Sequence, residues 1–216
     1  LGLDTLKGWW FTVVETDVNN DGKLDYVLGN IGSNIKYSAS EKKPFKVFAA
    51  DFDDSGSLDL VLSNDYNGTY VPSRGKECST QQMPFISEKF ETYAAFANAS
   101  LNDIYGSKLD EAYTRDVTTF ASVVLLNNGD SFDVINLPAA AQTGPILSIV
   151  KKDLNKDGFE DLIVAGAIYD TEVETPRYDA SRGSVLISNQ NSGYTTVRPA
   201  QSGVYFKGNV KDILSV

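Results

Sequence analysis

The chain has 216 residues, a hydrophobic content of 42% and a formal net charge of -10. This length and composition are sufficient for a folded core, and no apolar run approaches the ~20 residues that a membrane-spanning helix needs. The acidic balance argues against nucleic acid as a partner, because binding to phosphates requires a basic surface. The sequence therefore predicts a globular chain without a membrane span.

The residues that are absent restrict the possible chemistry. The sequence has no histidine, and Cys78 is its one cysteine. Without histidine the commonest general base is missing, and neither a Ser-His nor a Cys-His nucleophile can be assembled. No Walker-type or G-x-G-x-x-G phosphate loop occurs. We therefore predict that the chain is not an enzyme, although catalysis by lysine or by a carboxylate pair stays open.

The first predicted element is a strand, an acidic loop and a second strand. Residues 10–16 and 26–28 are rich in β-branched and aromatic residues, which favours strands. Between them runs the sequence Asp17-Val-Asn19-Asn-Asp21-Gly22-Lys23-Leu-Asp25. Oxygen side chains at positions 1, 3 and 5 can converge on one cation if the backbone turns sharply, and the glycine at position 6 permits that turn.

The same motif, D-x-[DN]-x-[DS]-G-x-x-D, recurs twice further along the chain. Apolar residues 45–48 and 60–62 flank the second copy, and residues 146–150 and 162–164 flank the third, so each again predicts a strand, a loop and a strand. The two copies are Asp51-Phe-Asp53-Asp-Ser55-Gly56-Ser57-Leu-Asp59 and Asp153-Leu-Asn155-Lys-Asp157-Gly158-Phe159-Glu-Asp161.

Oxygen donors without histidine or a reactive thiol suit Ca²⁺ better than zinc or copper. We expect up to three Ca²⁺, one in each loop, with a carbonyl ligand at position 7 and a carboxylate at position 9. Three ions would change the formal charge from -10 to -4, so we expect stability to depend on metal. The Ser55 loop should be the weakest, because a neutral hydroxyl replaces a carboxylate. The expected ligands are Asp17, Asn19, Asp21, Lys23 and Asp25; Asp51, Asp53, Ser55, Ser57 and Asp59; and Asp153, Asn155, Asp157, Phe159 and Asp161.

The flanking residues indicate the type of calcium motif. An EF-hand carries a glutamate at position 12 between two helices, whereas position 12 here is Leu28, Leu62 or Val164 and the flanks are strands. A strand, this loop and a second strand ending in Gly or Asn resemble the FG-GAP or VCBS repeat of integrin α-subunit heads and of large secreted bacterial proteins. The resemblance implies β-propeller blades, with the metal loop between the first two strands of a blade.

The spacing of the loops indicates an insertion. Asp51 follows Asp17 by 34 residues, whereas Asp153 follows Asp51 by 102, and a regular repeat would show one period. Apolar residues take helical spacing between Gln81 and Arg115. We therefore predict a small α-helical insert over residues 81–115, within a single β-propeller segment that covers residues 1–216. Within the insert, Ser100 and Ser107 are expected to be helix N-caps.

Two hairpins are predicted after the insert. The first joins residues 121–126 and 132–137 across an Asn-Gly turn, and we expect it to supply the outer two strands of the blade that begins at Phe45. The second joins residues 184–188 and 194–198 and completes the third repeat. Val204 to Leu214 resembles a further inner strand pair without a metal loop.

The predicted fold class is therefore mainly β, with about three to four partial blades of FG-GAP/VCBS type. Because a propeller ring closes with about 4 to 8 blades, we expect this chain to need either the remainder of a longer propeller or a second copy. The chain begins with Leu1 and shows no signal peptide, so we expect it to be a processed or excised part of a longer protein.

Two further sets of residues are candidates for ligand binding. The polar stretch from Tyr169 to Arg182 is longer than a hairpin requires, and binding residues collect in such loops. The alternative is a solvated connection whose Arg and Asp residues pair with each other. The second set consists of aromatic residues of the kind that stack on sugar rings or fill interfaces, and core packing is the alternative for at least one of its tryptophans. The first set is Glu172, Glu174, Arg177, Tyr178, Asp179 and Arg182, and the second is Trp9, Trp10, Tyr66 and Tyr70.

Together these features predict a secreted, cell-surface or periplasmic module, stabilised by calcium, that serves adhesion or binds a carbohydrate or protein ligand. One rival is the propeller part of a secreted enzyme that acts on polysaccharide, and another is a purely architectural spacer. The missing histidine counts against the enzyme. Glycan-array binding with and without EDTA distinguishes the three. Specific binding favours adhesion, turnover favours the enzyme, and a result with neither binding nor turnover favours the spacer.

Overall fold

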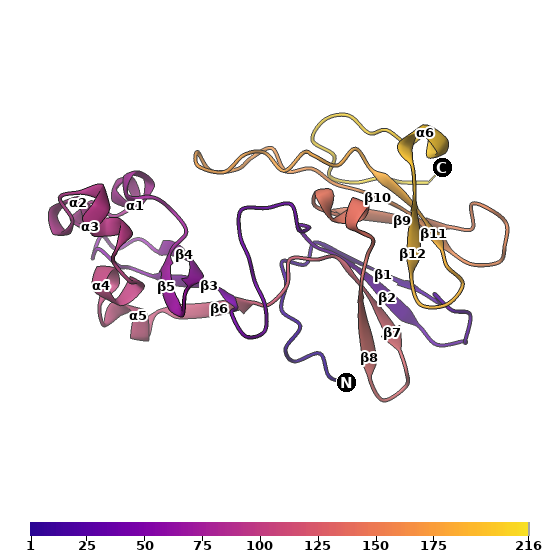
Figure 1. Cartoon of the computed structure of the whole chain (residues 1–216), viewed down its shortest axis with the longest axis horizontal. Helices are drawn as coiled ribbons and strands as arrows, with labels where there is room; N and C mark the ends of the chain where they lie inside the picture. The colour runs from indigo at the N-terminus through magenta and orange to yellow at the C-terminus, as the bar shows by residue number, and fades with distance from the viewer. Residues whose placement is uncertain (216) are drawn as a thin grey trace. The chain divides into compact units, whose positions relative to one another are not determined.

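Three four-stranded antiparallel sheets and a group of short helices make up the structure, a computed structural model that describes residues 1–215 (Figure 1). The fold is mainly β, as the sequence predicts. The chain divides into two compact units: unit 1 contains residues 1–36 and the chain from residue 120 onward, and unit 2 contains residues 37–119. The single propeller segment predicted over residues 1–216 stays a prediction.

The first sheet of unit 1 has the strand order β1-β2-β7-β8, and the first acidic loop joins β1 to β2. The β7–β8 hairpin forms as predicted, but it pairs with β2 and not with the strands that begin at Phe45. This pairing places Val27 opposite Val124, and both side chains are fully buried. The strands are Thr12–Thr16 (β1), Asp25–Gly29 (β2), Val123–Asn127 (β7) and Phe132–Asn136 (β8).

The second sheet of unit 1 has the order β12-β11-β10-β9, and the third acidic loop joins β9 to β10. Both sheets contribute to one core, in which Val27 and Val124 pack with Leu162 and Leu186. Gly29 lies where the sheets approach each other, and a side chain there would collide with the carbonyl oxygen of Ile146. The strands are Ser148–Lys152 (β9), Asp161–Ala165 (β10), Ser184–Ser188 (β11) and Tyr194–Val197 (β12), and two short helical turns are Ala139–Thr143 (η1) and Pro199–Ser202 (α6).

The strand pair predicted from Val204 to Leu214 does not form. This segment is irregular, and it bonds to the rest of unit 1 through single backbone contacts, such as that from the Ala167 N–H to the Val210 carbonyl oxygen (2.9 Å). The Phe206 N–H donates to the Arg182 carbonyl oxygen, also at 2.9 Å. Backbone groups of both halves of the predicted pair therefore bond to other segments of unit 1 and not to each other.

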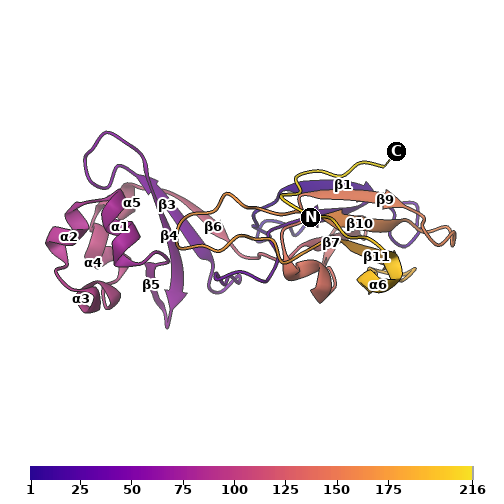
Figure 2. The same ribbon diagram turned by 90° about the horizontal axis from the view of Figure 1, so that it is seen from above.

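Unit 2 contains the third sheet, with the order β5-β4-β3-β6, and five helices between β5 and β6. The second acidic loop joins β3 to β4. In both views the helices lie together beside this sheet (Figure 1, Figure 2). The strands are Phe45–Ala50 (β3), Asp59–Tyr66 (β4), Thr69–Pro72 (β5) and Tyr113–Val117 (β6), and the helices are Lys76–Gln82 (α1), Phe85–Lys89 (α2), Tyr93–Ala97 (α3), Leu101–Tyr105 (α4) and Lys108–Glu111 (α5).

The helices differ from the predicted insert at both ends. They begin at Lys76, five residues before the predicted range, and the last predicted residues belong to β6, where Arg115 lies opposite Val47. Ser100 caps α4 as predicted, because its Oγ accepts a bond of 3.1 Å from the Asp103 N–H. Ser107 is the N-cap residue of α5, as predicted, but its side chain makes no capping hydrogen bond.

The apolar residues of the helices pack on the sheet of unit 2. Ile86, Phe96 and Leu101 are buried in one cluster with Phe52 and Val61. This contact supplies the partner surface that their helical spacing requires. Among residues 1–215 no helix is long and apolar enough to cross a membrane.

Unit 2 as a whole is inserted between β2 and β7 of the first sheet of unit 1. The insertion is therefore larger than the helical segment that the sequence predicts, because it also includes four strands and the second acidic loop. The uneven spacing of the three loops follows from this arrangement: only the first and third loops belong to unit 1.

Candidate metal centres in three acidic loops

The three acidic loops adopt one backbone conformation. Position 4 has φ values of 56°, 60° and 63°, and position 6 has values of 81°, 82° and 90°. Glycine adopts positive φ without strain, and Asn and Asp tolerate it better than most residues. The sharp turn that the motif predicts is therefore present in every loop. The residues are Asn20, Asp54 and Lys156 at position 4, and Gly22, Gly56 and Gly158 at position 6.

The carboxylate at position 1 holds each turn together. In the first loop, Asp17 Oδ1 accepts a bond from the Asp21 N–H (3.0 Å) and its Oδ2 accepts one from the Gly22 N–H (2.9 Å). Asn19 Oδ1 at position 3 accepts from the same Asp21 N–H (3.2 Å). The other loops repeat all three bonds. The oxygens of positions 1 and 3 are thus held on the inside of the turn.

The carboxylate at position 9 is buried in each loop: Asp25, Asp59 and Asp161 are 1%, 5% and 0% exposed. One of its oxygens accepts from the N–H at position 2, at 2.8 to 3.1 Å. In unit 1 its other oxygen accepts from the last residue of the third strand, Asn127 (2.7 Å) or Ser188 (2.9 Å). A carboxylate has about four lone-pair sites, so capacity for a cation remains. Position 9 therefore joins the loop to a strand that is distant in sequence.

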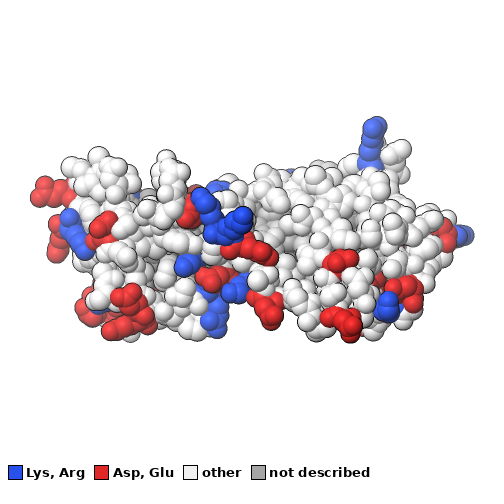
Figure 3. All heavy atoms as spheres, turned by 60° about the horizontal axis from the view of Figure 1, so that its bottom comes forward, with Lys and Arg blue, Asp and Glu red and all other residues white. Residues whose placement is uncertain are grey.

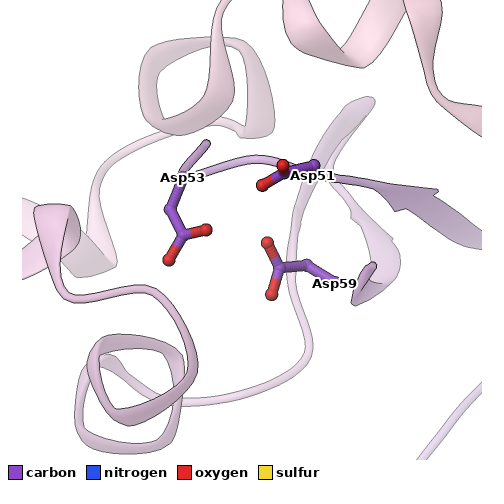
Figure 4. A group of neighbouring side chains, drawn as sticks. All are labelled: Asp51, Asp53 and Asp59. Atoms are coloured by element: carbon purple, nitrogen blue, oxygen red, sulfur yellow. The ribbon is translucent and has the colours of Figure 1, made fainter. Parts of the chain in front are cut away.

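In the second loop three carboxylates meet. Ligand oxygens of Asp51, Asp53 and Asp59 lie within 4.8 Å of one another, and Figure 4 shows them turned toward a common space. Within the described chain they form the one group of three or more acidic, histidine or cysteine side chains with this geometry. The second loop is expected to bind calcium most weakly because of Ser55. It brings three carboxylates together because Asp53 occupies position 3, where the other two loops have asparagine. Carboxylates this close repel each other unless a cation lies between them.

The donor set fits a hard divalent cation. All predicted side-chain ligands are oxygens, and the N–H at position 7 donates to the side chain at position 5, which places the two residues on the same turn. The backbone and side chain of Lys23 hold the pKa of Asp21 below its ordinary value. Hydrogen bonds from the Gln190 side chain and, to a smaller extent, from the Phe159 backbone lower the pKa of Asp157. Both carboxylates are therefore charged at neutral pH, as a calcium ligand must be.

Two helices of unit 2 contact the second loop, and the sequence motif gave no sign of them. Gln82 of α1 donates from Nε2 to Asp59 Oδ1 (3.2 Å), in the place that the third strand fills in unit 1. Lys108 of α5 donates to the carbonyl oxygens of Asp51 (3.3 Å) and Phe52 (3.1 Å) and pairs with Asp54 (2.7 Å). No local pattern distinguishes these two side chains from other helical Gln and Lys residues, so only the fold identifies them.

Replacing Gln82 by alanine is expected to weaken calcium binding at the second loop by about tenfold, because loss of an outer-shell hydrogen bond typically has an effect of this size on metal affinity. The calcium affinities of the other two loops, measured by calorimetric titration, should be unchanged. The matched control is Gln81→Ala, which alters an exposed neighbour on the same helix. Equal affinities in the two variants would show that Gln82 does not orient Asp59.

The structure separates the predicted ligand-binding residues of the 169–182 stretch. Arg177, Tyr178 and Asp179 line a cavity of about 380 Å³, together with Lys36. Glu172 pairs at 3.2 Å with Lys36, which lies outside the stretch. The two remaining candidates, Glu174 and Arg182, are not among the residues that line this cavity.

The four aromatic candidates belong to different units. In unit 1 Trp9 packs edge-on against Phe120, with ring centroids 5.2 Å apart, in agreement with the core-packing alternative. In unit 2 the Tyr70 hydroxyl donates to the Pro44 carbonyl oxygen at 2.9 Å, whereas Tyr66 is 69% exposed. The contacts of Trp9 and Tyr70 are thus structural.

Acidic and basic side chains are interspersed on the face drawn in Figure 3. The absence of a nucleic-acid partner stays a prediction, which rests on the net charge of -10. Comparisons with known protein families, with curated protein sequences and with solved structures find no match for this chain.

Proposed function

We propose that this chain is a calcium-binding module in which each of the three acidic loops holds one Ca²⁺. The observation that supports this most is the repetition of one loop conformation, with the same bonds to positions 1, 3 and 9, in three separate places along the chain. Oxygen ligands on a flexible loop favour calcium over magnesium, which demands a near-ideal octahedron.

The sheets are, in this proposal, β-propeller blades of the FG-GAP/VCBS type. Three features support it: the metal loop joins the first two strands in each sheet of unit 1, a hairpin supplies the next two strands, and the two sheets share a core. The ring is completed by the remainder of a longer propeller or by a second copy, because about 4 blades are the minimum for closure.

The proposed task of the module is adhesion or ligand binding, in a secreted, cell-surface or periplasmic protein. The cavity beside Arg177 and Tyr178 supports a ligand that is polar, such as a carbohydrate or a protein loop, since it offers an aromatic ring next to charged groups. In the same proposal, calcium fixes the loops and takes no part in catalysis.

Metal analysis tests the proposal directly. The protein dialysed against millimolar calcium should hold three equivalents, and each of the variants Asp17→Ala, Asp51→Ala and Asp153→Ala should hold two, because each change removes the carboxylate that holds one turn together. The matched control is Asp54→Asn, since Asp54 lies in a loop at a position that is not a ligand and its side chain is 84% exposed. This variant should keep three equivalents.

Two results would contradict the proposal. Fewer than two equivalents of calcium in the unmodified protein would remove its basis, and so would a preference for zinc over calcium. A count of three that no loop variant lowers would place the ions elsewhere in the chain.

A further inference from the structure

A side chain of the first loop reaches the third loop within unit 1. Asn20 Nδ2 donates to the carbonyl oxygen of Gly158 at 3.1 Å. Asn20 stands between the candidate ligands Asn19 and Asp21, and Gly158 stands between Asp157 and Phe159. The bond therefore joins the middle of one candidate metal loop to the middle of the other.

A second bond joins the ends of the same two loops. Thr16, the residue before Asp17, donates from Oγ1 to Glu160 Oε2 at 2.9 Å. Glu160 is the residue before Asp161 and also pairs with Lys151 of β9 at 3.2 Å. Thr16 is 1% exposed, so this link is shielded from water on the Thr16 side.

The two loops are also anchored in one core. Val18, at position 2 of the first loop, is 1% exposed and belongs to one buried cluster with Tyr194 of β12, which is 7% exposed. The same cluster includes Leu162, which directly follows Asp161 of the third loop.

We propose that the first and third loops bind Ca²⁺ cooperatively and that Asn20 is the positioning residue that transmits order between them. This inference rests on the proposed function. Without metal the carboxylates of each loop repel each other and loosen the turn. An ion in the first loop fixes Asn20, which then holds the Gly158 carbonyl and the peptide that leads to the Phe159 ligand. The third loop is thereby preorganised for its ion. Because such coupling is reciprocal, an ion in the third loop raises the calcium affinity of the first loop by the same factor.

Repulsion between the two ions opposes this effect but is the smaller influence. Each loop carries three carboxylates at ligand positions, so the ligand side chains and their ion together carry a charge of -1. Of these carboxylates, those at position 5 are exposed and those at position 9 are buried. The exposed charges are screened over about 8 Å at physiological ionic strength. Two interloop hydrogen bonds should therefore dominate, with a coupling of roughly threefold to tenfold in affinity.

The test uses the Asp51→Ala variant, in which only the first and third loops can bind calcium. Calorimetry should show two ions that bind with a Hill coefficient above 1. Adding Asn20→Gly should lower the coefficient toward 1 while two ions still bind, because one of the two interloop bonds is removed. Glycine is chosen because φ at this position is 56°, where alanine would be strained. The matched control is Lys156→Gly, at the same position of the third loop with φ of 63°, which should keep the cooperativity.

A second measurement leaves Asn20 intact. In the double variant Asp51→Ala/Asp153→Ala only the first loop binds, and its affinity should be roughly threefold to tenfold lower than in Asp51→Ala alone. If two ions bind with equal affinity and independently of each other in the Asp51→Ala background, the cooperative inference is overturned and the proposed function stands. Absence of calcium binding in that background would overturn both.

Discussion

Replacing Asp161 by alanine is expected to lower the free energy of unfolding of unit 1 by about 2 to 6 kcal/mol, even in the presence of EDTA. The Asp161 carboxylate is fully buried and accepts from the N–H groups of Leu154 (2.9 Å) and Ser188 (2.9 Å). The Ser188 bond is buried and the Leu154 bond is partly buried, and a buried donor that loses its partner costs about 1 to 3 kcal/mol. Urea unfolding followed by circular dichroism measures the change.

Asp157→Ala is the matched control for this prediction, because it removes a carboxylate of the same loop that is exposed. In EDTA its effect on the free energy of unfolding should be well below that of Asp161→Ala. Asp161→Asn should fall between the two, since the amide keeps one acceptor oxygen. If Asp161→Ala and Asp157→Ala unfold alike in EDTA, position 9 has no structural role apart from metal.

Chelation of calcium is expected to lower the melting temperature of unit 1 by roughly 10 to 20 °C. Calcium at about 100 times its dissociation constant contributes about 2.7 kcal/mol per site, and unit 1 contains two of the loops. A loss of about 5 kcal/mol corresponds to that shift at about 2 to 4 °C per kcal/mol. Scanning calorimetry in calcium and in EDTA measures it, and magnesium should restore little of the loss.

The control for chelation is a protein that lacks the sites. Asp17→Ala/Asp51→Ala/Asp153→Ala should melt at the same temperature with and without EDTA, since each change removes the position-1 carboxylate of one loop. An unmodified protein whose transition does not move, although metal analysis confirms that calcium has left, would show that the loops do not stabilise the fold.

The parts of the fold that could be predicted from the sequence are those with a local cause. The strands around each loop follow from short runs of β-branched and aromatic residues, and the turns follow from Gly22, Gly56 and Gly158, whose positive φ is present in the structure. The β7–β8 hairpin was predicted from its Asn-Gly turn, and Gly129 in that turn has φ of 93° in the structure. Each of these signals lies within a few residues of the structure that it specifies.

Features that depend on distant residues could not be read in this way. The β7–β8 hairpin was assigned to the wrong sheet because its alternation of apolar residues suits either partner, and only burial of Val124 against Val27 selects β2. The start of α1 was missed because Lys76 to Gln82 is polar and buries only Ser79. Such a helix is held by its surroundings and not by an apolar stripe.

The same division applies to the candidate site. Its ligand positions form a contiguous pattern, so the sequence shows them, whereas the groups that orient the ligands come from elsewhere in the chain. Asn127 and Gln82 bond to position-9 carboxylates from 102 and 23 residues away. A motif of nine residues carries no information about such partners.

The insertion of unit 2 between β2 and β7 also sets the order in which the protein can form during its synthesis. After Gly29 leaves the ribosome, the free edge of β2 has no partner until Val123 follows, 94 residues later. At about 5 to 20 residues per second this interval is roughly 5 to 20 s. Unit 2 emerges complete within it and has its own core. Unit 1 must therefore keep an unpaired strand edge, with the Asn127 contact to Asp25 still missing, while an entire second unit folds.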